Sequence, residues 1–177
     1  MKNLFLVFSI LFFSNLLAQT DSLVIQDSIS RIRIYTSTEK SLDLRLGYGK
    51  YDAHFIEIGI AKTTVTWGCM GNTGSSIYGS LEFIPSQWTH HEENIYAIKT
   101  GAEVNILFFS LGAEAKYQTD FHQNDFVLSP KVGIGFANRF MVYYAYQASL
   151  HNQPFDDALS PHQFQVVCNI TLKKINK

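Results

Sequence analysis

The sequence predicts an all-β protein, an eight-stranded antiparallel up-and-down transmembrane β-barrel with a polar, filled lumen. Three observations predict this fold class. Apolar and polar residues alternate with a period of two through eight successive segments. The polar face of these segments combines glycine and other small residues with charges of both signs, and the chain starts with an apolar stretch typical of exported proteins.

The composition excludes two broad classes of protein. The chain has 177 residues and a net charge of -1, with 14% aromatic and 16% charged residues. A nucleic-acid clamp would be strongly basic, and a disordered tail would be charged and poor in aromatic residues. We therefore expect one folded domain of ordinary size and no nucleic-acid partner.

The N-terminal residues 1–18 have the features of a cleaved signal peptide. A short positive start is followed by an apolar run from Leu4 to Leu17, and Ala18 supplies a small residue before a cut at Gln19. The alternative, an uncleaved anchor, would need about 20 apolar residues. We expect export to the outer membrane, with residues 19–40 as a periplasmic N-terminal extension and residues 41–174 as the barrel.

The first four expected strands are 41–50, 54–66, 76–84 and 95–107. Each has one apolar face opposite a face of small or charged residues, which is typical of a strand. Their apolar faces comprise Leu42, Leu44, Leu46 and Tyr48; Ile56, Ile58 and Ile60; Ile77, Leu81 and Phe83; and Tyr96, Ile98, Ala102, Val104 and Ile106.

The last four expected strands are 109–118, 126–136, 140–150 and 162–173. The alternation is weakest in 140–150, where tyrosines occupy both faces. The apolar faces comprise Phe109, Leu111, Ala113, Ala115 and Tyr117; Leu128, Val132, Ile134 and Phe136; Val142, Tyr144, Tyr146 and Leu150; and Phe164, Val166, Cys168, Ile170 and Leu172.

Two connections have the length that antiparallel hairpins require. The apolar parity changes between 95–107 and 109–118, which predicts a two-residue turn at Leu107–Phe108, although these residues are poor turn formers. Parity is kept between 126–136 and 140–150, which predicts a three-residue turn at 137–139 with Asn138 in a left-handed conformation. Pro130 lacks a ladder donor, so we expect a bulge or a late strand start there.

The polar face is expected to point into the lumen, because the interior of an eight-stranded barrel is just wide enough for side chains to fill it. Its charges nearly cancel, and buried charges must be paired. The acids are Asp43, Glu57, Glu82, Glu103 and Glu114, and the bases are Arg45, Lys99, Lys116 and Lys131. We expect one buried network containing Asp43, Arg45, Glu57, Lys99, Glu103, Glu114 and Lys116.

The stretches SPKVGIGFANRFMVYYAYQASL (129–150) and HQFQVVCNITLKK (162–174) carry a family resemblance. With the signal peptide and eight alternating strands, the chain resembles the small eight-stranded outer-membrane β-barrel proteins of Gram-negative cells, of the OmpA/OmpX type. The resemblance covers about 41–174, but the family's usual terminal aromatic residue is absent. It implies that both chain ends are periplasmic, with short periplasmic turns, and the connection at 67–76 departs from that rule.

The two cysteines do not make a disulfide framework. Cys69 lies in a glycine-rich turn and Cys168 in a strand, and we interpret them as unrelated thiols, with a Cys69–Cys168 bridge as the alternative.

Histidines and acids gather in or beside the expected outer loops, and they suggest two kinds of site. A zinc or haem site would use His90, His91, His122, His151 and His162 with Glu92, Glu93, Asp120, Asp125, Asp156 and Asp157. An enzyme acting on outer-leaflet lipid would use Ser149 as nucleophile, His151 as base and Asp157 as the acid.

Neither pattern has the spacing of a known motif, and we predict no catalytic, cofactor-binding or metal-ligating residues. The prediction is a monomeric, non-catalytic outer-membrane barrel whose partner is outer-membrane lipid. Its structural or surface-interaction role would use the loops 85–94, 119–125 and 151–161. Two alternatives stay open, a soluble periplasmic lipocalin-like barrel that binds a small apolar ligand and the outer-leaflet lipid-modifying barrel enzyme.

Overall fold

The computed structural model describes residues 37–68, 71–89, 93–150, 154–155 and 159–175. The expected signal peptide and Cys69 lie outside these residues, as does the segment 19–36. The elements, in chain order, are β1 (Ser37–Lys50), β2 (His54–Gly68), β3 (Gly71–Ile84), the 3-10 turn η2 (Ser86–Trp88), β4 (Ile95–Ile106), β5 (Phe109–Thr119), β6 (Asn124–Phe136), β7 (Phe140–Tyr146), β8 (Ala148–Ser149) and β9 (His162–Lys174).

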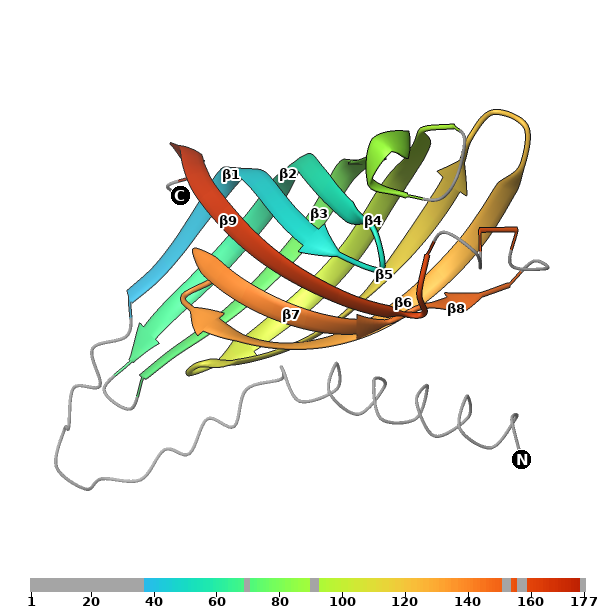
Figure 1. The fold of residues 1–177 in the computed structure, drawn as a ribbon. Coiled ribbons are helices and arrows are strands. Elements are labelled where there is room, and N and C mark those ends of the chain that lie inside the picture. Colours follow the sequence, from blue (N-terminus) through green and yellow to red (C-terminus); the bar gives the residue numbers. More distant parts are fainter. Residues whose placement is uncertain (1–36, 69–70, 90–92, 151–153, 156–158, 176–177) are drawn as a thin grey trace, which may run out of the picture. The chain divides into compact units, whose positions relative to one another are not determined.

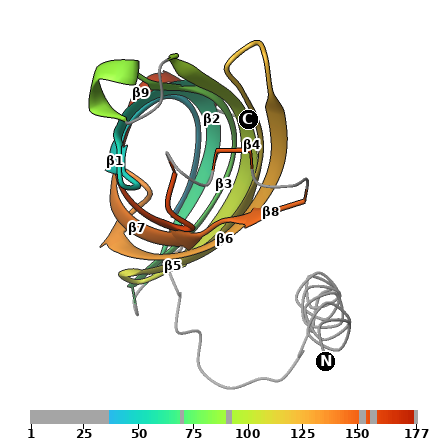
Figure 2. The same ribbon diagram turned by 45° about the vertical axis from the view of Figure 1, so that its right-hand side comes forward.

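All strands belong to one antiparallel sheet that closes on itself (Figures 1 and 2). From β1 to β7 each strand pairs with the next along the chain, β7 pairs with β9, and β9 pairs with β1 to complete the ring. The short strand β8 continues the register of β7 on β6, since Lys131 faces Ala145 and Leu128 faces Ala148. The ring therefore has eight strands, with β7 and β8 as one of them, and this confirms the all-β antiparallel prediction.

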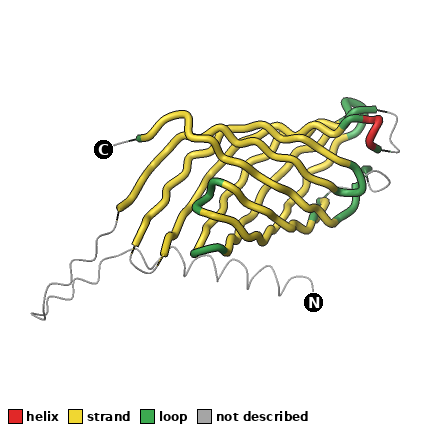
Figure 3. Tube along the Cα trace, turned by 60° about the vertical axis from the view of Figure 1, so that its left-hand side comes forward, coloured by secondary structure: helices red, strands yellow, loops and turns green. Residues whose placement is uncertain are grey.

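The connections divide between two ends of the ring (Figure 3). We call one the loop end; it holds the connections 51–53, 85–94, 120–123 and 150–161. The other, the terminal end, holds the connections 69–70, 107–108 and 137–139 and the start of β1. The expected long connection at 67–76 is wrong, because β2 runs to Gly68 and β3 begins at Gly71, with pairing throughout. Every connection at the terminal end is therefore short.

The two predicted hairpin turns are confirmed. Ile106 faces Phe109 across a two-residue turn in which Leu107 has φ 58°, a left-handed conformation that a branched side chain disfavours. In the turn at 137–139, Asn138 has φ 57°, as predicted, and Ala137 also has a positive φ.

The prediction of a bulge or late start at Pro130 is wrong. β6 runs without interruption through Pro130, which faces Ala113 of β5. On the other side, β6 pairs with β7 from Lys131 and with β8 up to Leu128, so Pro130 falls in the break between these two ladders. A residue without an N–H is tolerated there because no ladder bond depends on it.

The two faces of the sheet have opposite chemistry. The alternating burial pattern turns most polar residues of the long strands into the ring and most apolar residues outward, as the parity predicts. The strand β7 differs, because its inward residues are Met141, Tyr143 and Ala145. Small residues on the inner face make room for rings. A Cβ at Gly101 would lie 2.5 Å from the Tyr78 hydroxyl, and one at Gly133 would lie 2.5 Å from the Tyr143 ring. At these glycine positions the strand contributes only backbone, and a ring from a neighbouring strand fills the space.

Candidate functional site

The middle of the ring interior is a network of buried ion pairs. Arg45 of β1 contacts Glu57 at 2.8 Å and Glu103 at 3.0 Å, and Lys131 of β6 contacts Glu103 at 3.0 Å. Lys99 of β4 contacts Glu57, the pair being shorter than an ordinary hydrogen bond, and Glu82 at 2.8 Å. Lys116 of β5 contacts Glu114 at 2.9 Å. Four cations thus meet four carboxylates, and their formal charges cancel.

Two tyrosines link these charges to one another. The Tyr78 hydroxyl donates to Glu114 at 2.6 Å and accepts from Lys131 at 2.7 Å, while the Arg45 guanidinium lies 3.8 Å from the Tyr78 ring centre. The Tyr51 hydroxyl, in the turn at 51–53, donates to Glu82 at 2.5 Å and accepts from Lys116 at 2.9 Å. Burial, with help from the Glu82 carboxylate, raises the pKa of Tyr51 well above its usual range, so this hydroxyl keeps its proton.

The membership of the network differs from the expected one. Asp43 is fully buried, but its charged contact is Arg139, 3.7 Å away in the turn at 137–139. Asp43 therefore belongs to the terminal end and not to the central network. Glu82 and Lys131, which the expected network omitted, are full members of it. Parity identifies which side chains point inward, but it does not say which of them meet across the interior.

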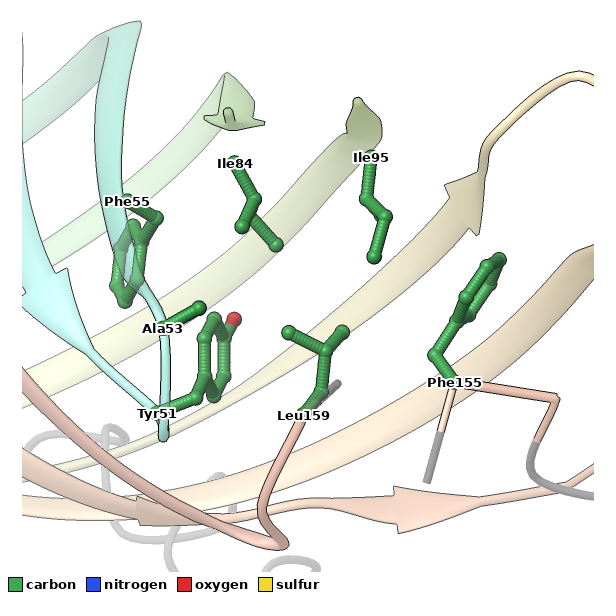
Figure 4. Packing of buried hydrophobic residues seen from close by; sticks show 7 residues of the cluster. All are labelled: Tyr51, Ala53, Phe55, Ile84, Ile95, Phe155 and Leu159. Atoms are coloured by element: carbon green, nitrogen blue, oxygen red, sulfur yellow. The ribbon is translucent and has the colours of Figure 1, made fainter. Parts of the chain in front are cut away.

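An apolar cluster closes the loop end of the interior (Figure 4). It combines the turn at 51–53 with the ends of three strands and with two residues of the connection 150–161. Phe155 and Leu159 from this connection are buried, so the chain folds back over the mouth of the ring. The members are Tyr51, Ala53, Phe55, Ile84, Ile95, Phe155 and Leu159.

A small cavity lies beside this cluster. Its volume is about 40 Å³, enough for about three water molecules and far below the several hundred Å³ of a typical small-molecule site. Its lining includes Gln118, Asp125 and Ser149, and the Ser149 hydroxyl donates to Asp125 at 2.8 Å. The cavity is therefore too small to hold a lipid or an organic substrate.

We expect the reconstituted monomer to conduct no measurable ionic current. Arg45, Lys99 and Lys116 are all fully or almost fully buried within the ring, and the apolar cluster lies between them and the loop end. An ion path would require this packing to open. Single-channel recording in a planar bilayer checks the expectation; stable current steps of the size that open porins give would contradict a filled interior.

The structure brings few of the candidate site residues together. His122 contacts Glu93 at 3.2 Å at the loop end, and both side chains are exposed. His162 instead points outward from β9 and shares a hydrogen bond of 2.7 Å with the Tyr144 hydroxyl. Among the described residues, no three histidine, cysteine or acidic side chains are placed to hold a metal ion.

Six of the other candidates cannot be compared with the fold. His90, His91, Glu92, His151, Asp156 and Asp157 lie outside the described residues. Ser149, the nucleophile of the alternative lipid-modifying enzyme, points toward the interior as its parity predicts. Cys168 is a free thiol on the outer face of β9.

The outer face carries a band of aliphatic residues with aromatic residues toward both ends. Ile58 and Val104, in the band, are 55% and 51% exposed. The exposed aromatic residues near the loop end are Tyr48, Trp88, Tyr96, Tyr117, Phe121, Phe126, Tyr144, Tyr146 and Phe164, and those near the terminal end are Trp67, Phe108, Phe109, Phe136 and Phe140. Within the described strands, Lys62 is the one outward charged residue more than three positions from a strand end.

Sequence reasoning missed one histidine at this surface. His54, the first residue of β2, shares a hydrogen bond of 2.7 Å with Tyr48 on the outer face. In a strand, residues 54, 56 and 58 lie on one face, so His54 shares the outer face with Ile56 and Ile58. This alternation is the signal in the sequence that could have identified His54 as an outward histidine.

No helix in the described part of the chain is long and apolar enough to cross a membrane. Comparison with family models, with curated proteins and with solved structures finds no match to this chain.

Proposed function

We propose that this protein is a non-catalytic outer-membrane β-barrel, of the general type of the small OmpA/OmpX barrels, with a structural or surface-interaction role. One observation carries the proposal: the exposed aliphatic band bounded on both sides by aromatic residues. Transmembrane barrels have such a band, and their aromatic girdles lie at the two membrane interfaces. Monomeric soluble proteins rarely expose an apolar face that runs over so many neighbouring strands.

The chemistry of the interior favours this proposal over the lipocalin-like alternative. A soluble ligand-binding barrel of that kind has an apolar interior and a solvated outer face. Here charged residues such as Arg45 and Lys99 are buried inside, whereas isoleucines in the middle of the strands, such as Ile58 and Ile98, point outward. Reversing the two faces would require a one-residue slip in every strand.

The same interior argues for a role at the surface. Neither the packed charge network nor the cavity of about 40 Å³ offers a site for a substrate. Any partner would therefore contact the connections of the loop end or the outer wall. The residues proposed for lipid hydrolysis include Ser149, whose hydroxyl is engaged by Asp125. We therefore propose that the protein has no catalytic activity and that it is a monomer whose partner is membrane lipid.

Labelling of single cysteines in intact cells tests the proposed placement. In a background with Cys69 and Cys168 changed to serine, Gln123→Cys introduces a thiol at the loop end, and Glu39→Cys introduces one at the terminal end; both positions are exposed. A maleimide that does not cross the outer membrane should label Gln123→Cys on intact cells and Glu39→Cys only after lysis. Labelling of both thiols only after lysis would contradict a surface role.

A further inference from the structure

We propose that the outer face of β1, β2, β7 and β9 at the loop end binds the phosphate-bearing headgroup of an outer-leaflet lipid. We call this surface the headgroup row; it consists of Lys50, His54, His162 and the tyrosines paired with the two histidines, Tyr48 and Tyr144. The inference rests on the proposed function, because it requires this face to meet the membrane interface.

Two tyrosine–histidine pairs with the same geometry define the row. Tyr48 bonds Nδ1 of His54 at 2.7 Å, and their rings stack with centres 5.6 Å apart. Tyr144 bonds Nδ1 of His162 at 2.7 Å, and their rings stack with centres 5.9 Å apart. When each hydroxyl donates to Nδ1, the imidazole hydrogen resides on Nε2. Each pair then presents an N–H donor to the surroundings of the ring.

Lys50 supplies a positive charge between the two pairs. It faces His54 across the β1–β2 ladder and Phe164 across the β1–β9 ladder, and Phe164 in turn faces Tyr144. The Lys50 side chain is exposed on the same face. Adjacent strands are about 4.8 Å apart, so the donors, which lie on β2, β1 and β9, span roughly 10 Å across two strand spacings. A phosphate-bearing headgroup fits a row of this length.

The residues next to the row favour a lipid over a free anion. Toward the middle of the strands, the outward residues are Leu46, two positions from Tyr48, Ile56, two positions from His54, and Val166, four positions from His162. All three are exposed. An amphipathic molecule can place its acyl chains along these residues while its phosphate meets Lys50. Burial of acyl chains adds to the electrostatic attraction, which a soluble phosphate does not gain.

The local charge is also suitable for an anion. The neighbouring described acids are Asp52, which is exposed in the turn at 51–53, and Glu57, which points into the ring and is held by Arg45 and Lys99. Charge-assisted hydrogen bonds from lysine and imidazole donors are among those that bind phosphate oxygens most strongly.

The test compares the binding of two lipids with the same acyl chains, phosphatidic acid and phosphatidylcholine. Each is added to the full-length folded protein in a non-ionic detergent, and the bound lipid molecules are counted by native mass spectrometry. The wild type should bind phosphatidic acid more tightly. Lys50→Gln should weaken that binding about fivefold, which corresponds to the roughly 1 kcal/mol of one lysine at an anionic surface. Lys50→Gln with His54→Phe and His162→Phe should abolish the preference, since phenylalanine keeps a ring beside each tyrosine but removes the donor.

Lys173→Gln, an exposed lysine at the opposite end of the ring, is the matched control and should leave the preference unchanged. Heat-modifiable gel mobility verifies that each variant is folded. A preference kept by the triple variant overturns the headgroup row, as does displacement of phosphatidic acid by an equal concentration of inorganic phosphate. If the wild type enters vesicles of equimolar phosphatidylcholine and phosphatidic acid without any headgroup preference, only this inference fails. A wild type that stays out of such vesicles overturns the proposed function as well.

Discussion

Replacing Arg45 by methionine is expected to lower the free energy of unfolding by about 3–5 kcal/mol. Arg45 is fully buried and bridges Glu57 and Glu103, at 2.8 and 3.0 Å. Removing the guanidinium leaves four buried carboxylates opposite three lysines, so one negative charge is uncompensated inside the ring. Methionine fills a similar space without a charge, which separates the electrostatic loss from a cavity. Urea titration of the folded protein in lipid vesicles measures the change.

Two further variants sharpen this prediction. Lys173→Met removes a cation from an exposed position at the terminal end of β9 and should change stability by less than about 0.5 kcal/mol. Arg45→Met combined with Glu103→Gln restores the charge balance, so it should cost less than the sum of the single losses by about 0.5–3 kcal/mol. An Arg45→Met protein as stable as the wild type would show that the central ion pairs do not hold the interior together.

Replacing Ile58 by arginine is expected to destabilise the protein in a bilayer by about 2–4 kcal/mol if this residue lies near the midplane. Ile58 is 55% exposed on the outer face, and its neighbours in the register are Leu46 and Leu81, which are also exposed. In water the same change would cost little, because an exposed arginine is solvated. The sign and size of the effect therefore report the medium that surrounds this face.

Thr38→Arg is the matched control for Ile58→Arg, because Thr38 is exposed at the start of β1, away from the aliphatic band. Its expected cost is about 0–1 kcal/mol, as for arginine near an interface. Val104 provides a second test position on β4, which pairs with β3 on the side away from β2. Val104→Arg should have the same effect as Ile58→Arg. Equal and small effects at all three positions would indicate that the face is surrounded by water.

The period of two was sufficient to predict most of the fold. In a strand such as β2, with one polar and one apolar side, a slip of one residue would turn every isoleucine inward. Parity therefore fixed which residues lie on each face, and it fixed the turn lengths at 107–108 and 137–139. The extensions of β2 and β3 toward 69–70 were missed because their glycine, serine and asparagine residues have low strand propensity. Pairing with each other nevertheless keeps them extended.

Contacts across the interior could not be predicted in the same way. Whether Glu82 rather than Asp43 meets Lys99 depends on strand tilt and on how far each side chain extends, and neither leaves a periodic signal in the sequence. Phe155 and Leu159 close the loop end from a connection that has no period at all. The tyrosine–histidine pairs on the outer face depend on cross-strand neighbours, which become known only once the register is assigned.

The insertion of the folded ring into a lipid bilayer is the central claim, and partition of the purified wild-type chain tests it most directly. The unfolded chain is diluted from urea into buffer with or without phosphatidylcholine vesicles, the vesicles are floated through a density gradient, and gel mobility is compared before and after heating. We predict that the protein floats with the vesicles, stays bound in high salt, and migrates differently unheated because the ring resists cold detergent. A chain that folds without vesicles and remains a soluble monomer in aqueous buffer would contradict the claim.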